Sequence, residues 1–545
     1  MEFSTVDIVV FVSYCLLIVG IGLYVSRDQK GHEKNAEDYF LASKSLPWWA
    51  IGASLIAANI SAEQFIGMSG SGFAVGLAIA SYEWMAALTL LIVGKYFLPV
   101  FIEKGIYTIP EFVEKRFSKN LKTILAVFWI ALFIFVNLST VLFLGAKALD
   151  TIMGSGDGSL MLYAIVGLAF IAAAYSLYGG LSAVAWTDVV QVILLVIGGL
   201  ITTVAALNRV TPDGGILNGL SHIYASAESK FHMILTRDNP EFANLPGIAV
   251  LIGGMWVANL YYWGFNQYII QRTLAAKSLK EAQRGIAFAA FLKMIIPLIV
   301  VIPGIIAFVM YTQPNGTAVI EGVNAAFTKA DGSINFDKAY PWLISVFVTP
   351  GFKGLVVAAL AAAIVSSLAS MLNSTATIFT MDIYKPYINT QASEKETVNV
   401  GRIAAASSLI IACFTAPLLG NIPQAFQHIQ EYTGLVSPGI LAVFIMGLFW
   451  KKATNKGAII GVISSIIVAF LLKTPALGLP FMDQMFYTLI LSMVVIAGVS
   501  LSSSPDADDP KGIKLTNKTF ETDSVFNISA YIILILLAFL YAFFW

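Results

Sequence analysis

Long apolar runs fill most of the chain, and short polar segments separate them. A run of about 20 mostly apolar residues is the length that an α-helix needs to cross the hydrocarbon core of a bilayer. Fourteen such runs lie at about residues 6–26, 47–73, 76–101, 121–148, 159–178, 182–207, 245–269, 283–311, 352–384, 398–419, 423–450, 456–473, 481–501 and 526–545. The pattern predicts an all-α polytopic membrane protein with about 14 transmembrane helices.

Two of these runs contain polar and glycine residues that an uninterrupted membrane helix would avoid. The second run contains "NISAEQFIGMSGSG" and the seventh contains "LIGGMWVANLYYWGFNQY". Each predicts a discontinuous helix. The two runs are five positions apart in the series, an odd number, so the second must enter the membrane from the opposite side. This arrangement is typical of inverted repeats with a substrate site where the broken helices meet. The predicted repeats are residues 47–207 and 245–450.

The remaining segments flank these repeats. Residues 1–46 are expected to form an extra N-terminal helix and a loop, residues 208–244 an outer loop, and residues 451–545 three further helices.

Basic residues gather on one side of this arrangement. With the N-terminus outside, the loops on the inner side carry 22 of the 32 Lys and Arg residues. Cytoplasmic loops of membrane proteins carry such an excess, so both termini are predicted to be outside. The first run has no basic residue before it, which predicts an uncleaved helix rather than a signal peptide.

Composition agrees with a membrane protein and narrows its partners. The chain is 58% hydrophobic and 12% charged, and the charged share is about half that of an average soluble domain. The net charge of zero indicates no nucleic-acid partner.

Two charged residues lie inside runs at corresponding positions of the two repeats. Glu83 is in "ASYEWM" and Lys293 is in "AFLKMI". A charge at mid-membrane costs about 2.5–3.5 kcal/mol, so each is expected to face a cavity or a partner. Together they could neutralise one another and leave a site suited to a neutral, hydroxyl-rich solute. The alternative is a purely structural ion pair, or side chains that reach the interface.

The seventh run places a polar and an aromatic residue on one helical face. Asn259 and Tyr262 are three residues apart, with Trp263 beside them. An aromatic ring can cover the C–H face of a sugar while an amide binds its hydroxyls. An ordinary aromatic packing stripe explains the same pattern equally well.

The ninth run combines small residues with hydroxyls in "AAAIVSSLASMLNSTAT". Close helix packing explains most of it. Yet Ala363, Ser366 and Ser367 have the spacing i, i+3 and i+4, so one carbonyl and two hydroxyls can converge on an alkali cation. Free carbonyls of Ala57 and Ile60 at the break in the second run could complete its shell.

Asp188, in "AVAWTDVVQ", is expected just below this place, where it would bias the cation electrostatically. It could equally be an acid favoured by the dipole at a helix start.

No enzymatic pattern emerges. Cys15 and Cys413 lie in apolar runs, and the four histidines, His32, His222, His232 and His428, are scattered. No nucleophile–base or phosphate-binding motif is present, so the chain is predicted not to be an enzyme and to need no cofactor.

Several stretches resemble the sodium/solute symporter family along nearly the whole chain. They include "SLYGGLSAVAWTDVVQ", "GLVSPGILAVFIMGLFWKK", "SYEWM" and "WVANLYYWGFNQYIIQRTLAAKS". Within the family, the resemblance is closest to its sodium/galactose and sodium/glucose cotransporter branch. It implies a LeuT-type core of two inverted five-helix repeats, with sodium as the coupling ion, a neutral hexose as cargo, and a bacterial inner membrane as location.

The resemblance also implies roles for individual residues. The sugar ligands would be Gln64, Glu83, Asn259, Lys293 and Gln430, with Tyr262 stacking on the sugar as inner gate and Asn59 holding it. The outer gate would be Met68, Tyr82 and Phe426, and the sodium ligands would be Ala57, Ile60, Ala363, Ser366 and Ser367.

The family has a sugar-binding serine where this chain has Ala86, so one hydroxyl contact is missing. On an α-helix Glu63 would point about 100° away from Gln64. We therefore expect Glu63 to have a structural role, or to support the residues that bind the substrate, and not to bind the substrate itself.

Other cargoes for the same class remain open: inositol, proline, pantothenate or a nucleobase. A zwitterionic or anionic cargo would need a fixed counter-charge. A sodium-dependent sensor or a channel is a further alternative, and the oligomeric state is open.

Overall fold

The computed structural model describes residues 3–27, 34–154, 156–313, 323–329, 332–419, 425–503 and 508–545. Its α-helices are α1 (Thr5–Val25), α2 (Ala36–Leu41), α3 (Trp48–Asn59), α4 (Ser69–Ala74), α5 (Ser81–Ile92), α6 (Leu98–Glu103), α7 (Ile109–Arg116), α8 (Lys119–Ala131), α9 (Ser139–Met153), α10 (Met161–Leu207), α11 (Ile216–Ser226), α12 (Ala249–Ile252), α13 (Gly254–Phe265), α14 (Gln267–Leu274), α15 (Leu279–Thr312), α16 (Val323–Phe327), α17 (Ala339–Phe347), α18 (Phe352–Ile378), α19 (Glu394–Thr415), α20 (Ala425–Gly434), α21 (Ser437–Phe449), α22 (Asn455–Leu472), α23 (Phe481–Ser503) and α24 (Ser524–Phe543). No strand occurs in the part of the chain that the structure describes, only isolated bridges. His32 and the first residues of the run predicted at 423–450 lie outside it.

Ten helical segments in these described ranges are long and apolar enough to cross a membrane. They are Thr5–Val25, Leu77–Glu103, Lys119–Met153, Met161–Leu207, Leu279–Thr312, Phe352–Ile388, Glu394–Leu419, Asn455–Leu472, Phe481–Ser503 and Ser524–Phe543. The protein is therefore an all-α, multi-pass membrane protein.

The ten segments and the fourteen predicted runs differ at identifiable places. α10 joins the runs predicted at 159–178 and 182–207 into 47 residues, although Gly180 inside it is non-helical, with φ 61°. The runs predicted at 47–73, 245–269 and 423–450 are each divided among shorter helices. Broken helices fall below the length of a membrane span, which is why they are absent from the ten.

Both expected breaks are present. α3 ends at Asn59, Ile60 is extended with ψ 108°, and the chain resumes as the π-helix η2 (Glu63–Met68) and then α4. In the other half, α13 ends at Phe265, Asn266 is extended with ψ 120°, and α14 follows.

α15 packs along the first broken helix because glycines let the backbones approach. A Cβ on Gly304 of α15 would lie 2.0 Å from the Ser69 carbonyl oxygen of α4, and one on Gly52 of α3 would lie 2.7 Å from the Gly285 oxygen of α15. Side chains larger than hydrogen would push these helices apart. α15 therefore lies against both sides of the break.

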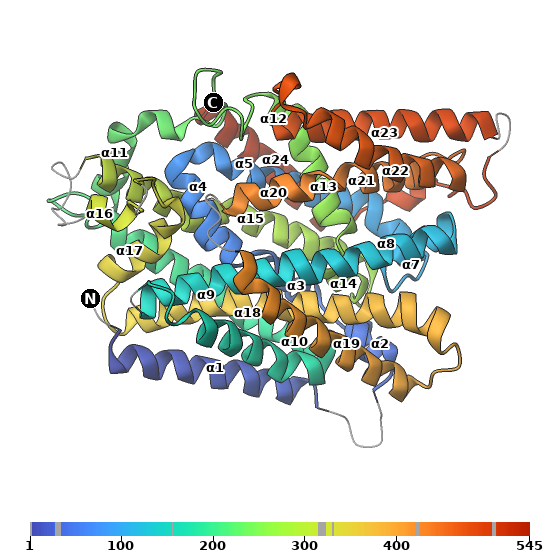
Figure 1. Cartoon of the computed structure of the whole chain (residues 1–545), viewed down its shortest axis with the longest axis horizontal. Helices are drawn as coiled ribbons and strands as arrows, with labels where there is room; N and C mark the ends of the chain where they lie inside the picture. The colour runs from blue at the N-terminus through green and yellow to red at the C-terminus, as the bar shows by residue number, and fades with distance from the viewer. Residues whose placement is uncertain are drawn as a thin grey trace.

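α18 is the most enclosed of the long helices. Figure 1 shows it running alongside α9, α10 and α1, which pack against it. Ser366 and Ser367 on α18 are fully buried. The helix therefore presents its hydroxyls to the interior of the protein and not to lipid.

Candidate substrate and cation sites

A cavity of about 50 Å³ lies beside the first break. Its lining residues come from both broken helices, α5, α15 and α20: Asn59, Glu63, Gln64, Tyr82, Glu83, Ala86, Ala258, Asn259, Tyr262, Trp263, Lys293, Phe426 and Gln430. All six residues predicted to bind substrate are among them. The cavity is small beside ligand pockets of about 300–1,000 Å³.

The small volume follows from polar side chains that bind one another. The Lys293 ammonium donates to the Glu83 carboxylate and to Asn59 Oδ1, and lies 5.0 Å from the centre of the Trp263 ring. Glu83 and Lys293 are 3% and 1% exposed. A buried pair of this kind compensates both charges, which would otherwise be very costly at this depth.

Tyr262 is held from two sides. Asn59 Nδ2 donates to its hydroxyl oxygen over 2.9 Å, and the Tyr268 hydroxyl donates to the same oxygen over 2.8 Å. Asn59 therefore links Lys293 with Tyr262, and α14 reaches the cavity through Tyr268.

The remaining amides are partly engaged by their own helices. Gln64 Oε1 accepts from the Ser61 backbone N–H over 2.9 Å, and Asn259 Nδ2 donates to the Met255 carbonyl over 3.2 Å. The side-chain N–H groups of Gln64 and the side-chain carbonyl of Asn259 therefore remain to bond a substrate. Gln430 on α20 lines the same cavity.

The prediction that the Glu63 side chain points away from the site lined by Gln64 was wrong. Glu63 lines the same cavity as Gln64. Residues 63–68 form a π-helix and not an α-helix, so the 100° step of an α-helix does not apply to this pair. Glu63 Oε1 is buried and has no hydrogen-bond partner among the described residues.

The three residues expected as an outer gate lie close to the cavity. Tyr82 and Phe426 meet edge to face, with ring centres 4.9 Å apart. Met68 is fully buried at the end of η2. Its neighbour Gly67 is so close to Phe426 that a Cβ there would lie 2.8 Å from the Phe426 Cβ.

The break also frees backbone carbonyls near α18. The Ser61 N–H bonds to Gln64 instead of continuing the helix to Ala57, and the Ser367 hydroxyl donates to the Ala58 oxygen over 2.9 Å. Ser366 donates to Asp188 Oδ1 over 2.5 Å. Because each serine donates its proton away, the lone pairs of both oxygens remain able to face a cation.

Asp188 belongs to a buried polar cluster that sequence reasoning found only in part. Its Oδ2 accepts from the Ser54 hydroxyl over 2.5 Å and lies 3.3 Å from Arg272 Nη2. Arg272 also donates to Ser370 and to the Tyr268 carbonyl.

In the sequence, Arg272 lies just beyond the apolar run predicted at 245–269, yet it is fully buried in α14. The signal that could have identified it is its position five residues after Gln267 on the second half of a broken helix. The cluster joins α3, α10, α14 and α18, and through Tyr268 it reaches the cavity.

Comparisons with known proteins identify the family to which the chain belongs. A model of the sodium:solute symporter family matches residues 39–465. The chain is 65% identical over 542 residues to a sodium/glucose cotransporter of Vibrio parahaemolyticus, covering 99% of this chain and 98% of that protein. It is 34% identical to human sodium/myo-inositol cotransporter 2, covering 91% and 76% respectively.

A solved structure of a Na⁺-coupled sialic acid symporter, in a substrate-bound outward-open state, superposes with a TM-score of 0.77 at 25% identity, covering 93% of this chain and 99% of that one. The fold is thus LeuT-like. The chain belongs to the sodium:solute symporter family.

Proposed function

We propose that this protein imports a neutral hexose, galactose or glucose, together with sodium by alternating access. The observation that carries the proposal is the cavity wall, which combines a charge-compensated Glu83–Lys293 pair with aromatic rings that include Tyr262 and with four side-chain amides, those of Asn59, Gln64, Asn259 and Gln430. Amides and paired charges bind hydroxyls, and Tyr262 can stack on a pyranose. The name of the 65% identical relative supports the same cargo.

The charge of the wall disfavours acidic cargo. Lys293 is already paired with Glu83, and Glu63 adds a second carboxylate to the same cavity. An anion such as pantothenate would lie close to this carboxylate, and the lysine that lines the cavity is already paired. Repulsion between the two negative charges, away from water, would therefore weaken its binding.

A polyol other than a hexose is the second candidate. myo-Inositol presents the same hydroxyl chemistry, and the relatives at 34–35% identity include sodium/myo-inositol cotransporters. Stacking on Tyr262 and hydrogen bonds to amides would serve either ring.

Sodium would bind where α18 meets the break in the first broken helix. Its ligands would be the carbonyls of Ala57, Ile60 and Ala363 and the hydroxyls of Ser366 and Ser367. Asp188, which accepts from Ser366, supplies a negative charge next to this place. The ion would hold α18 against α3 and so complete the cavity wall.

Access to the two sides would alternate through two gates. Sugar binding would close the lid of Met68, Tyr82 and Phe426 on the outer side. On the inner side, loss of sodium would let α18 move from the break and free Tyr262 from Asn59. One charge moving through 100 mV yields about 2.3 kcal/mol, which supports roughly 40-fold accumulation of sugar per sodium.

The membrane arrangement that fits this cycle has fourteen crossings. α10 would span about 70 Å as one helix, more than twice the 30 Å hydrocarbon core, so it counts as two crossings divided at Gly180. Counting each broken helix as one crossing gives repeats at residues 47–207 and 245–450, flanked by residues 1–46 and 451–545. Both termini would be outside a bacterial inner membrane.

Uptake by the purified protein in liposomes tests the proposal. Labelled galactose, glucose, inositol and proline are each offered with an inward sodium, potassium or proton gradient. We expect hexose uptake driven by sodium alone. Sugar uptake that ignores sodium, or proline uptake in place of sugar, would overturn it.

A further inference from the structure

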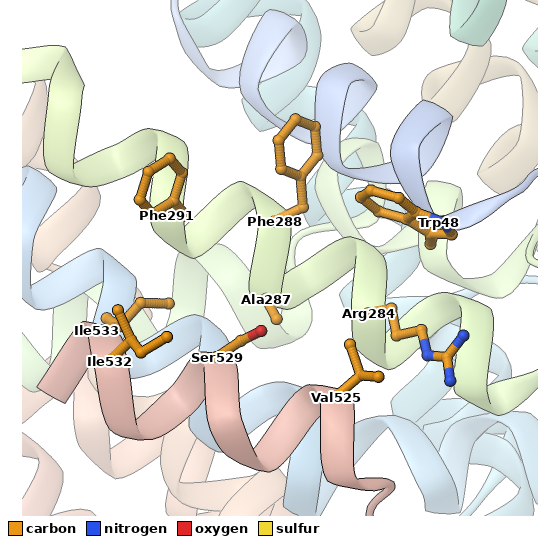
Figure 2. Close-up of a pocket in the computed structure, with 9 residues that line it drawn as sticks. All are labelled: Trp48, Arg284, Ala287, Phe288, Phe291, Val525, Ser529, Ile532 and Ile533. Carbon is orange, nitrogen blue, oxygen red and sulfur yellow. The ribbon is translucent and has the colours of Figure 1, made fainter.

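A second hollow, far larger than the cavity, runs along the surface between α15 and α24. Its volume is about 400 Å³, and it is lined by Trp48, Arg284, Ala287, Phe288, Phe291, Val525, Ser529, Ile532 and Ile533. Figure 2 shows these side chains along the two helices, with Trp48 coming from the neighbouring α3. Phe291 is 44% and Ile532 50% exposed. Both helices are membrane-crossing candidates, so apolar side chains exposed on them face lipid, and the groove suits a hydrocarbon chain.

One end of the groove is polar. Figure 2 shows Arg284 and Trp48 at this end and Phe291 and Ile532 at the other. Arg284 Nε and Nη2 lie 2.7 and 2.5 Å from Asp523 Oδ2. Nη1 has no partner among the residues that the structure describes, so one edge of the guanidinium is free for a phosphate. Tryptophan and arginine at a helix end are typical of the headgroup level.

The charges at this end balance. Lys280 lies one turn before Arg284 on α15, and its positive charge, like that of Arg284, lowers the pKa of Asp523. Glu281 accepts from the Trp48 backbone N–H over 2.7 Å. Two basic and two acidic side chains give no net attraction for an anionic headgroup, whereas a zwitterionic one offers a phosphate to Arg284 and an ammonium to the carboxylates.

We propose that this groove binds a phospholipid with a zwitterionic, primary-amine headgroup, that is, a phosphatidylethanolamine. One acyl chain fills the groove between α15 and α24, the phosphate bonds to Arg284, and the ammonium lies by Asp523 and Glu281. The lipid joins the C-terminal helix to α15, which carries Lys293 nine residues beyond Arg284. This binding is independent of which solute is transported.

The test uses the full-length protein, purified and delipidated in detergent. Added phosphatidylethanolamine, phosphatidylglycerol or phosphatidylcholine is titrated while Tm is followed, and native mass spectrometry counts bound lipid. We expect phosphatidylethanolamine to raise Tm most. Arg284→Ala should weaken its apparent affinity about tenfold, as expected for loss of one charged hydrogen bond, and Ser529→Trp should abolish the effect by filling the groove.

Matched variants keep the result interpretable. Arg237→Ala removes an exposed arginine elsewhere and should leave the lipid response unchanged, while Arg284→Lys, which keeps the charge, should restore part of it. Should Ser529→Trp fail to fold, Ser529→Leu fills part of the groove. An unchanged lipid response of the Arg284 and Ser529 variants overturns the proposal, and so does a larger response to phosphatidylglycerol than to phosphatidylethanolamine.

Discussion

The ammonium of Lys293 on α15 donates a hydrogen bond to the carboxylate of Glu83 on α5, inside the cavity that both broken helices line. The same ammonium reaches Asn59 at the end of α3. One cation thus joins three elements around the proposed sugar site, and neither charge of the pair is free to select a charged cargo.

Removing one member of this pair should be worse than removing both. Lys293→Ala leaves the Glu83 carboxylate buried and unpaired, which costs about 3–5 kcal/mol, whereas Lys293→Ala with Glu83→Ala leaves no uncompensated charge. We expect a large fall in Tm for the single variant, a smaller fall for the double variant, and no sugar uptake in either. Equal Tm values for the single and double variants would contradict a charge-compensating role.

Ser366→Ala should remove a sodium ligand and an Asp188 partner together. We expect the sodium concentration for half-maximal uptake to rise about tenfold, by the loss of one hydrogen bond or ligand to a charged group. Ser408→Ala on α19 is the control, because Ser408 is also buried yet bonds only to its own helix. Sodium-dependent uptake by Ser366→Ala that matches the control would show that the cation site is elsewhere.

Glu63→Gln should weaken sugar binding and leave sodium binding intact. Glu63 Oε1 has no partner in the cavity wall, so a substrate hydroxyl is its natural donor, and a neutral amide is a weaker acceptor. We expect KM to rise about tenfold with the sodium concentration for half-maximal uptake unchanged. Deoxy-sugars, each lacking one hydroxyl, identify the contact, since one of them should be insensitive to the substitution. If the variant has the same KM as the wild type for every sugar, Glu63 does not contact the substrate and its role is structural.

Ala86→Ser restores a hydroxyl to the cavity wall. Ala86 lines the cavity and is 1% exposed. One neutral hydrogen bond contributes about 0.5–1.5 kcal/mol, so we expect KM for the preferred sugar to fall by roughly two- to tenfold. Ala87→Ser is the control, because Ala87 is equally buried but does not line the cavity. If both variants change KM alike, the effect comes from added volume and not from the hydroxyl.

Much of this fold could be predicted from the sequence because hydrophobic length and helix-breaking residues are local signals. The runs around Ile60 and Asn266 predict breaks that the structure contains. The direction of the Glu63 side chain could not be predicted in this way. It lies in a π-helix, and no sequence pattern in the run predicts one.

Arg272 could not be placed for a related reason. In the sequence it adjoins a basic loop, and only the packing of α14 against α3 and α18 buries it beside Asp188. Tertiary packing decides such positions, and a hydropathy pattern does not report it.

Asp523→Asn should make the stability of the protein, measured as Tm, less sensitive to a fall in pH. Burial raises the pKa of Asp523, but the Phe526 N–H and Arg284 outweigh it and hold that pKa below its ordinary value. The ionised carboxylate therefore adds stability that is present above the ordinary pKa of 3.8 and is lost as the pH falls through the lower folded value. Asparagine can still cap the helix, so the substitution removes only the charge. We expect the wild type to have the higher Tm near neutral pH, with the difference narrowing as the pH approaches about 3. A difference in Tm that stays constant over this range would mean that the Arg284–Asp523 pair adds no pH-dependent stability.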